Sequence, residues 1–235
     1  MFSQTTIRVL SEIARKCPER FLDACNSLNE NQTKSKYWLV EKLNEYPHKF
    51  VNKKADKGDF QVSLLAGWYG YLAYILIDEF RLQIGDWKPK IGEINIVDYD
   101  TQNKRISRIL FGHKDRENIR EGKPCFVSYK EKDITKLNTN SYFKKFSIVI
   151  NTSCEHIEQE GLNTNMSKIA KGTLVVLQSN NYKSSPQHIN CSDSLEEFAK
   201  RYSKYLKDVK LYEKPFLNFT RYMIIGVKKK WIKNK

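Results

Sequence analysis

The sequence predicts a doubly wound α/β fold, in which helices cover both faces of a mostly parallel sheet. Five short apolar runs, bounded by glycine, proline or charge, occupy residues 62–66, 94–97, 125–128, 146–150 and 173–177. Runs of this kind are typical of strands buried on both faces. Segments able to form helices separate them, and this alternation indicates right-handed βαβ units. The 235 residues suffice for one such domain.

The residues before the first strand predict a helical cap. Ile7, Leu10 and Ile13 follow the spacing of an amphipathic helix, and residues 21–28 continue it after a break at Pro18. A third helical stripe follows a polar stretch and ends before residue 47. We therefore divide the chain into an N-terminal helical cap, residues 1–58, and an α/β core, residues 59–235.

Crossover helices are expected between the strands at residues 71–81, 102–110 and 166–170. Residues 194–206 predict a further helix, with Ser192 or Ser194 as its cap and acidic residues in its first turn. The final runs, 209–212 and 221–227, are joined by a short loop, which favours an antiparallel hairpin.

Charge, hydropathy and cysteine usage indicate the partners and the compartment that we expect for the protein. The formal net charge of +14 attracts anionic partners, nucleic acid among them, although a lysine-rich composition alone produces the same surplus. No apolar run approaches the roughly 20 residues that span a bilayer, and no signal peptide is visible, so we expect a cytoplasmic protein that does not contact membranes. The five cysteines are widely spaced, and the four histidines lack metal-ligand spacing beside them, so we expect no metal site.

The first predicted strand leads into a turn that contains Ala66, Gly67, Trp68 and Gly70. Glycines between a strand and a helix let the backbone approach a ligand, and the helix N-terminus offers free N–H groups. A tight turn that needs left-handed backbone explains the same residues equally well.

Acidic residues follow the next two strands. Asp98, with Tyr99 after it, ends the second strand, where a carboxylate can accept hydrogen bonds from a ribose diol. After the third strand, Asp133 can accept a hydrogen bond from an adenine amino group while Ile134 packs on the ring. A helix N-cap at Asp133 is the alternative.

The fourth strand is followed by a polar cluster, residues 151–156, at the edge where open α/β sheets bind ligands. Within this cluster, His156 and Glu155 are the candidates for a general base, since a histidine titrates near neutral pH. Local packing at the start of a helix is the alternative role for His156.

This arrangement resembles the class I S-adenosylmethionine-dependent methyltransferases over residues 60–230. The resemblance implies a seven-stranded sheet in the order 3-2-1-4-5-7-6. It also implies that the turn at residues 66–70 wraps the methionine part of S-adenosylmethionine, that Asp98 and Tyr99 hold the ribose, and that Asp133 and Ile134 hold the adenine. Asn151, Glu155 and His156 would border the transferable methyl group.

The expected function is therefore methyl transfer to an unidentified acceptor. A small molecule or an exposed nucleotide, as in RNA, is favoured over duplex DNA, because only a helical cap stands beside the core and we see no separate target-recognition domain. Two alternatives remain open: a lyase or hydrolase that cleaves S-adenosylmethionine, and a nucleic-acid-binding module that keeps the fold without activity.

Overall fold

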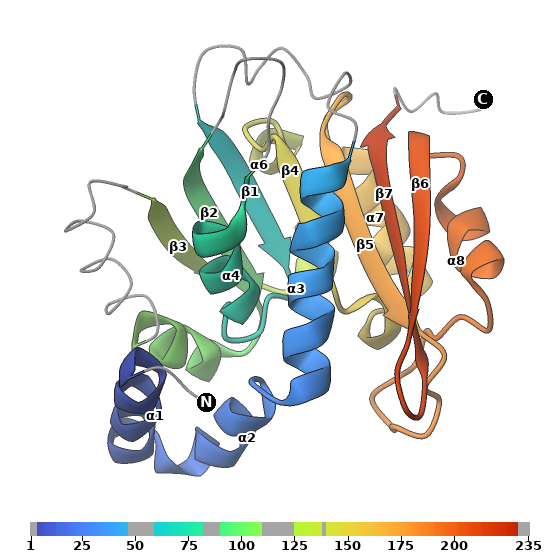
Figure 1. Ribbon diagram of the computed structural model, residues 1–235. Coiled ribbons are helices and arrows are strands. Elements are labelled where there is room, and N and C mark those ends of the chain that lie inside the picture. Colours follow the sequence, from blue (N-terminus) through green and yellow to red (C-terminus); the bar gives the residue numbers. More distant parts are fainter. Residues whose placement is uncertain (1–3, 47–58, 82–89, 110–124, 138–139, 230–235) are drawn as a thin grey trace.

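The computed structural model describes residues 4–46, 59–81, 90–109, 125–137 and 140–229. A seven-stranded sheet in the order β3-β2-β1-β4-β5-β7-β6 forms its centre (Figure 1). Its strands are β1 (Phe60–Leu65), β2 (Ile91–Asp98), β3 (Phe126–Glu131), β4 (Ile148–Asn151), β5 (Leu174–Asn180), β6 (Leu206–Pro215) and β7 (Thr220–Lys228). The first five strands run parallel and β7 runs antiparallel to both of its neighbours. The predicted fold class and strand order are confirmed.

Alternating side chains of the central strands pack into two cores. Leu64 and Ile96 contribute to the core under α3 (Glu30–Glu45), α4 (Tyr71–Glu79) and the helix at residues 101–109. Their neighbours Leu65 and Val97 face the opposite core. That second core lies under α6 (Asn140–Phe143), α7 (Gln159–Lys168) and α8 (Leu195–Tyr202). Because both faces are buried, the central strands read as continuous apolar runs.

The predicted N-terminal helices are present as α1 (Gln4–Lys16), a short 3-10 turn η1 (Pro18–Arg20), α2 (Phe21–Asn26) and α3. The side chain of Asn29 caps α3 by accepting a hydrogen bond from the backbone N–H of Gln32 at 2.9 Å. Helices α1 and α2 lie at the end of the sheet where the parallel strands stop, whereas α3 runs along one face beside α4 (Figure 1). The proposed boundary at residue 58 lies outside the described residues.

Some predicted bounds were wrong. The helix expected at 166–170 begins seven residues earlier, because Leu162 and Met166 of α7 form its buried stripe although polar residues surround them in sequence. The helix expected to reach residue 206 ends at Tyr202, and β6 already begins at Leu206. β6 is a mostly exposed edge strand, so no apolar run marks its full length. In the described part of the chain, no helix combines the length and the apolar character needed to cross a bilayer.

Candidate functional site

The turn after β1 has an uncommon backbone conformation. Ala66 and Trp68 have φ angles of 49° and 50°, and Gly70 has a φ of 78°. Left-handed backbone in residues with side chains stores strain, which is often found at ligand sites. Gly67 is required for a different reason, because a Cβ there would lie 2.7 Å from Cγ2 of Ile96. The turn is therefore pressed closely onto β2.

Asp98, at the end of β2, fixes this turn. Its Oδ2 accepts a hydrogen bond from the backbone N–H of Trp68 at 2.8 Å. Its Oδ1 accepts from the backbone N–H of Asp100 at 3.1 Å and from Nδ2 of Asn103 at 3.3 Å. Burial raises the pKa of Asp98, and these hydrogen bonds oppose that rise. Asp98 is thus a structural partner of the turn, with lone pairs left over for a further donor.

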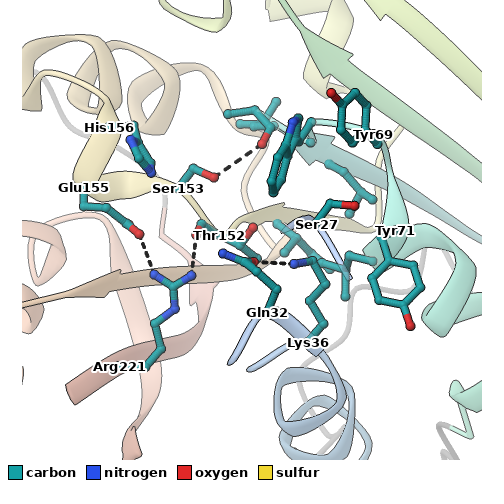
Figure 2. A pocket seen from close by; sticks show the side chains of 17 residues that line it. Ser27, Gln32, Lys36, Tyr69, Tyr71, Thr152, Ser153, Glu155, His156 and Arg221 are labelled. Atoms are coloured by element: carbon teal, nitrogen blue, oxygen red, sulfur yellow. Dashed lines mark hydrogen bonds and ion pairs between the residues drawn. The ribbon is translucent and has the colours of Figure 1, made fainter. Parts of the chain in front are cut away.

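A pocket opens at the carboxyl ends of β1 and β4 (Figure 2). The cap contributes Ser27, directly after α2, and Gln32 and Lys36 of α3 to its wall, and the turn contributes residues 66–69. The segment after β4 and the start of β7 complete the wall with Thr152, Ser153, Glu155, His156 and Arg221. Figure 2 shows that these polar side chains from distant parts of the sequence converge on one space.

The structure brings only part of the predicted site together. Ala66, Gly67, Trp68, Glu155 and His156 line the pocket. Five other predicted residues do not line it. Gly70 is the N-cap of α4, and Tyr99 is 78% exposed. Asp133 caps the 3-10 turn η4 (Ile134–Lys136), Ile134 belongs to the core, and Asn151 is buried at the end of β4. Asp98 lies behind the turn, as described above.

Glu155 forms a buried ion pair that sequence reasoning did not foresee. Its Oε1 lies 2.5 Å from Nη1 of Arg221 and also accepts a hydrogen bond from Nδ2 of Asn180 at 2.7 Å. Arg221 donates in addition to the backbone carbonyl of Thr152 at 3.3 Å. The carboxylate that the sequence suggested as a general base is therefore held in an ion pair.

Lys36 is the functional candidate that the sequence analysis missed. It lies on α3, it is 9% exposed, and its Nζ donates to Oε1 of Gln32 at 2.5 Å. Burial, with a smaller contribution from the charge of Arg221, lowers the pKa of Lys36 to about 7. The pattern that could have revealed it is helical: Lys36 occupies the same stripe as Leu39, Val40 and Leu43, which is an apolar face.

His156 lies in the 3-10 turn η5 (Cys154–His156), directly after β4. Its Nδ1 is 3.1 Å from the backbone carbonyl of Gln187, and its ring meets that of His188 edge to face at 4.5 Å. Desolvation of the ring by the groups packed around it lowers the pKa of His156, although the residue as a whole is exposed. The ring borders the pocket.

The chain was also compared with known proteins. No protein-family model matches the sequence, and no curated protein matches it. Solved structures do match. NodS, an N-methyltransferase from Bradyrhizobium japonicum, aligns with a TM-score of 0.52 and 8% identity, over 86% of this chain and 98% of its own. A putative O-methyltransferase from Klebsiella pneumoniae aligns with a TM-score of 0.55 and 12% identity, over 97% and 91%.

The N-terminal domain of EvdMO1, solved with SAH bound, gives a TM-score of 0.51 at 11% identity, over 83% of this chain and 81% of that domain. The seven-stranded order β3-β2-β1-β4-β5-β7-β6 with antiparallel β7 completes the match. The chain has the class I methyltransferase fold.

Within this methyltransferase fold, the cap is tied directly to the turn. Arg20 donates from Nε to the hydroxyl of Tyr69 at 2.9 Å, from Nη1 to Asp100 at 2.8 Å and from Nη2 to Asn103 at 2.9 Å. Asp23 of α2 accepts from the hydroxyl of Tyr69. We call Arg20, Asp23, Tyr69, Asp100 and Asn103 the cap clasp. It holds the cap over the ends of β1 and β2.

The donors around the pocket fit the methionine part of the cofactor of this fold. Thr152 and Ser153 offer hydroxyls beside the turn, and Arg221, although paired with Glu155, keeps N–H groups that a carboxylate can accept from. The ribose side fits less directly, because Asp98 already accepts three hydrogen bonds. A sugar hydroxyl would have to use its remaining lone pairs.

Proposed function

We propose that the protein transfers the methyl group of S-adenosylmethionine to an acceptor held in the pocket between the turn after β1 and the segment after β4. The observation that carries this proposal is the composition of that pocket. The strained turn forms one wall, and ionisable side chains from α3, η5 and β7 form the other. The shared fold supports it.

S-adenosylmethionine, when bound, supplies a methyl group on a sulfonium, which leaves orientation as the main task of the protein. We assign Ala66, Gly67, Trp68 and Gly70 to its methionine part. Asp98 and Tyr99 are assigned to the ribose, and Asp133 and Ile134 to the adenine. This assignment follows the positions of these residues at the ends of β1, β2 and β3.

Lys36 is the proposed proton acceptor for an acceptor group that carries a proton. A base works best when its pKa lies near the working pH, and burial brings the pKa of Lys36 to about 7. Glu155, by contrast, is held in an ion pair with Arg221. We keep His156 as a contact of the acceptor at the opposite side of the pocket. We assign Asn151 a positioning role for the segment after β4, because its Oδ1 accepts a hydrogen bond from the backbone N–H of Ser153 at 2.9 Å.

The acceptor we favour is a small molecule or an exposed nucleotide. The cap contributes Ser27 and two residues of α3 to the pocket wall, which suits a compact group better than duplex DNA. The net charge of +14 would favour an anionic acceptor or RNA. No disulfide bond joins the five cysteines, all of which lie within the described residues, and this supports our placement of the protein in the reducing cytoplasm.

The test is incubation of the purified protein with methyl-labelled S-adenosylmethionine and candidate acceptor pools. We expect demethylated cofactor together with a labelled acceptor. Other cofactor fragments without a labelled acceptor would instead identify a cleaving enzyme. Binding of nucleic acid without any turnover would identify a binding module. Either of these two outcomes would overturn the proposal.

A further inference from the structure

Three side chains of metal-ligating type meet at the edge of the pocket. Glu155 and His156 are neighbours in η5, and His188 belongs to the loop between β5 and α8. One ligand-type atom from each of the three lies within 4.8 Å of the others. The sequence analysis expected no metal site, because the histidines lack metal-ligand spacing; His156 and His188 are 32 positions apart, and only the fold brings them together.

Both imidazole rings are held in one tautomer by the backbone. Nδ1 of His156 lies 3.1 Å from the carbonyl oxygen of Gln187, and Nδ1 of His188 lies 2.5 Å from that of Tyr182. A carbonyl oxygen can only accept, so each Nδ1 carries the proton. In the neutral ring Nε2 then bears the lone pair that binds metal. Metal-binding histidines are usually oriented by such a second hydrogen bond.

The carboxylate of Glu155 supplies an independent observation. The side chain is 3% exposed, and its Oε1 is taken by Arg221 and Asn180. Its Oε2 is buried and has no hydrogen-bond partner within the described part of the chain. A buried carboxylate oxygen without a partner is costly, so it usually marks an unseen ion, water or ligand.

We propose that Glu155, His156 and His188 form a binding site for one divalent transition-metal ion, with Zn²⁺ as the ion that these ligands fit best. Two imidazoles and one carboxylate are a common zinc ligand set, and three protein ligands leave a position open. Mg²⁺ fits poorly, because it prefers oxygen ligands.

The geometry requires a modest closure. Ligand atoms of a tetrahedral zinc site lie about 3.3 Å apart at the usual bond lengths, compared with at most 4.8 Å here. His156 is exposed and His188 is half-buried in a loop, so both can turn toward the buried oxygen of Glu155. Because Arg221 holds Oε1, Glu155 would bind through Oε2 alone. This site does not depend on methyl transfer, and its open position would face the pocket that His156 and Glu155 line.

The experiment is calorimetric titration of the chelator-treated full-length protein with ZnCl₂, followed by the absorption spectrum of the Co²⁺-loaded protein. We expect one equivalent of Zn²⁺ to bind and the Co²⁺ spectrum to be that of a four- or five-coordinate ion. His188→Ala should weaken binding by at least about tenfold, since it removes one of three protein ligands. His188 is half-buried in a loop and belongs to neither core, so circular dichroism should show an unchanged fold.

Three further variants sharpen the test. Glu155→Gln should weaken Zn²⁺ binding as His188→Ala does. Glu158→Gln, an exposed carboxylate in the same segment, is the matched control and should bind as the wild type does. Cys191→Ser should also bind normally, although a nearby thiol could otherwise capture zinc. Wild-type protein that does not bind Zn²⁺ at 100-fold excess, or normal binding by His188→Ala, would overturn the proposal.

Discussion

The turn after β1 and the segment after β4 border the same pocket, yet they differ in how their polar groups are satisfied. Around the turn, Asp98 accepts three hydrogen bonds and the cap clasp joins five side chains. After β4, Oε2 of Glu155 and Nδ2 of Asn151 are buried without a partner among the described residues. Lys36, across the pocket, is buried, and its Nζ donates a hydrogen bond to Gln32 of the same helix.

This difference distinguishes residues that fix the backbone from residues whose polar groups are available to a ligand. A group whose hydrogen bonds are complete serves mainly to fix the backbone, as Asp98 does for the turn. A buried polar group with incomplete partners costs stability and is retained where a ligand completes it. Substitutions around the turn should therefore act mainly on folding, whereas substitutions at Lys36 should act mainly on turnover.

The largest effect is expected from Glu155→Ala, which leaves Arg221 as a buried, uncompensated charge. Breaking a buried ion pair costs about 3–5 kcal/mol, and both side chains here are under 10% exposed. Urea denaturation should show this loss, whereas Glu158→Ala should stay close to wild type. The double variant Glu155→Ala/Arg221→Met should recover part of the stability. If Glu155→Ala alone costs under about 1 kcal/mol, the pair does not support the segment after β4.

Lys36→Met should lower turnover about 10²-fold, the usual loss when a general base is removed. Affinity for S-adenosylmethionine should change little. In the wild type, turnover should rise with pH through about 7, because Lys36 must lose its proton to act. Lys34→Met, on the same helix and exposed, is the control. Normal turnover in Lys36→Met would dismiss the assignment.

Lys36 should also make the free energy of unfolding depend on pH. Its pKa is about 7 in the folded chain and 10.5 when unperturbed. Between these values the unfolded chain binds a proton that the folded chain does not, so the free energy of unfolding should rise with pH over this window. Lys36→Met should lose that dependence and be more stable than wild type near neutral pH. Denaturation curves at pH 7 and pH 9 would measure it, and identical pH dependence in both proteins would contradict a buried amine.

Gly67→Ala tests the packing of the turn. The new Cβ would lie 2.7 Å from Cγ2 of Ile96, and overpacking of this kind costs about 1–3 kcal/mol. In a double-mutant cycle with Ile96→Ala, the combined loss should be smaller than the sum of the two single losses. Strict additivity would show that Gly67 is needed for another reason.

The smallest effect is expected from Arg20→Ala in the cap clasp. Its side chain is 22% exposed, so the loss of several hydrogen bonds should cost only about 1 kcal/mol. Arg15→Ala, which removes an exposed arginine of α1, is the matched control. Faster hydrogen exchange in α2 of Arg20→Ala would show that the clasp holds the cap. Unchanged exchange would mean that the apolar contacts of α1–α3 hold it alone.

The sequence was sufficient for the fold because its central strands are buried on both faces. Apolar runs such as residues 173–177 predict such strands, and the predicted final hairpin distinguished this sheet from other α/β sheets. Elements with one exposed face were harder to place. α7 begins at Gln159 among polar residues, and β6 shows little alternation of apolar and polar side chains. Neither boundary could therefore be predicted from hydropathy.

The site was predictable only where it follows a strand directly. Ala66, Gly67, Glu155 and His156 could be named because they come immediately after apolar runs. Lys36 and Arg221 enter the pocket from α3 and β7, and His188 approaches from a loop, so tertiary contacts decide their positions. For Asp98 the sequence predicted the position at the end of β2 but not the hydrogen bonds. Those bonds, to Trp68, Asp100 and Asn103, depend on the backbone geometry of the turn and of the segment that leads into the helix at residues 101–109.

Calorimetric titration of the wild-type protein with S-adenosylmethionine tests the central claim most directly. The account predicts saturable binding at one site per chain. It also predicts that Thr152, Ser153 and Arg221 of the pocket wall become protected in the complex, as hydrogen exchange of their amides would show. No binding at millimolar cofactor, with a nicotinamide dinucleotide binding in its place, would contradict the account.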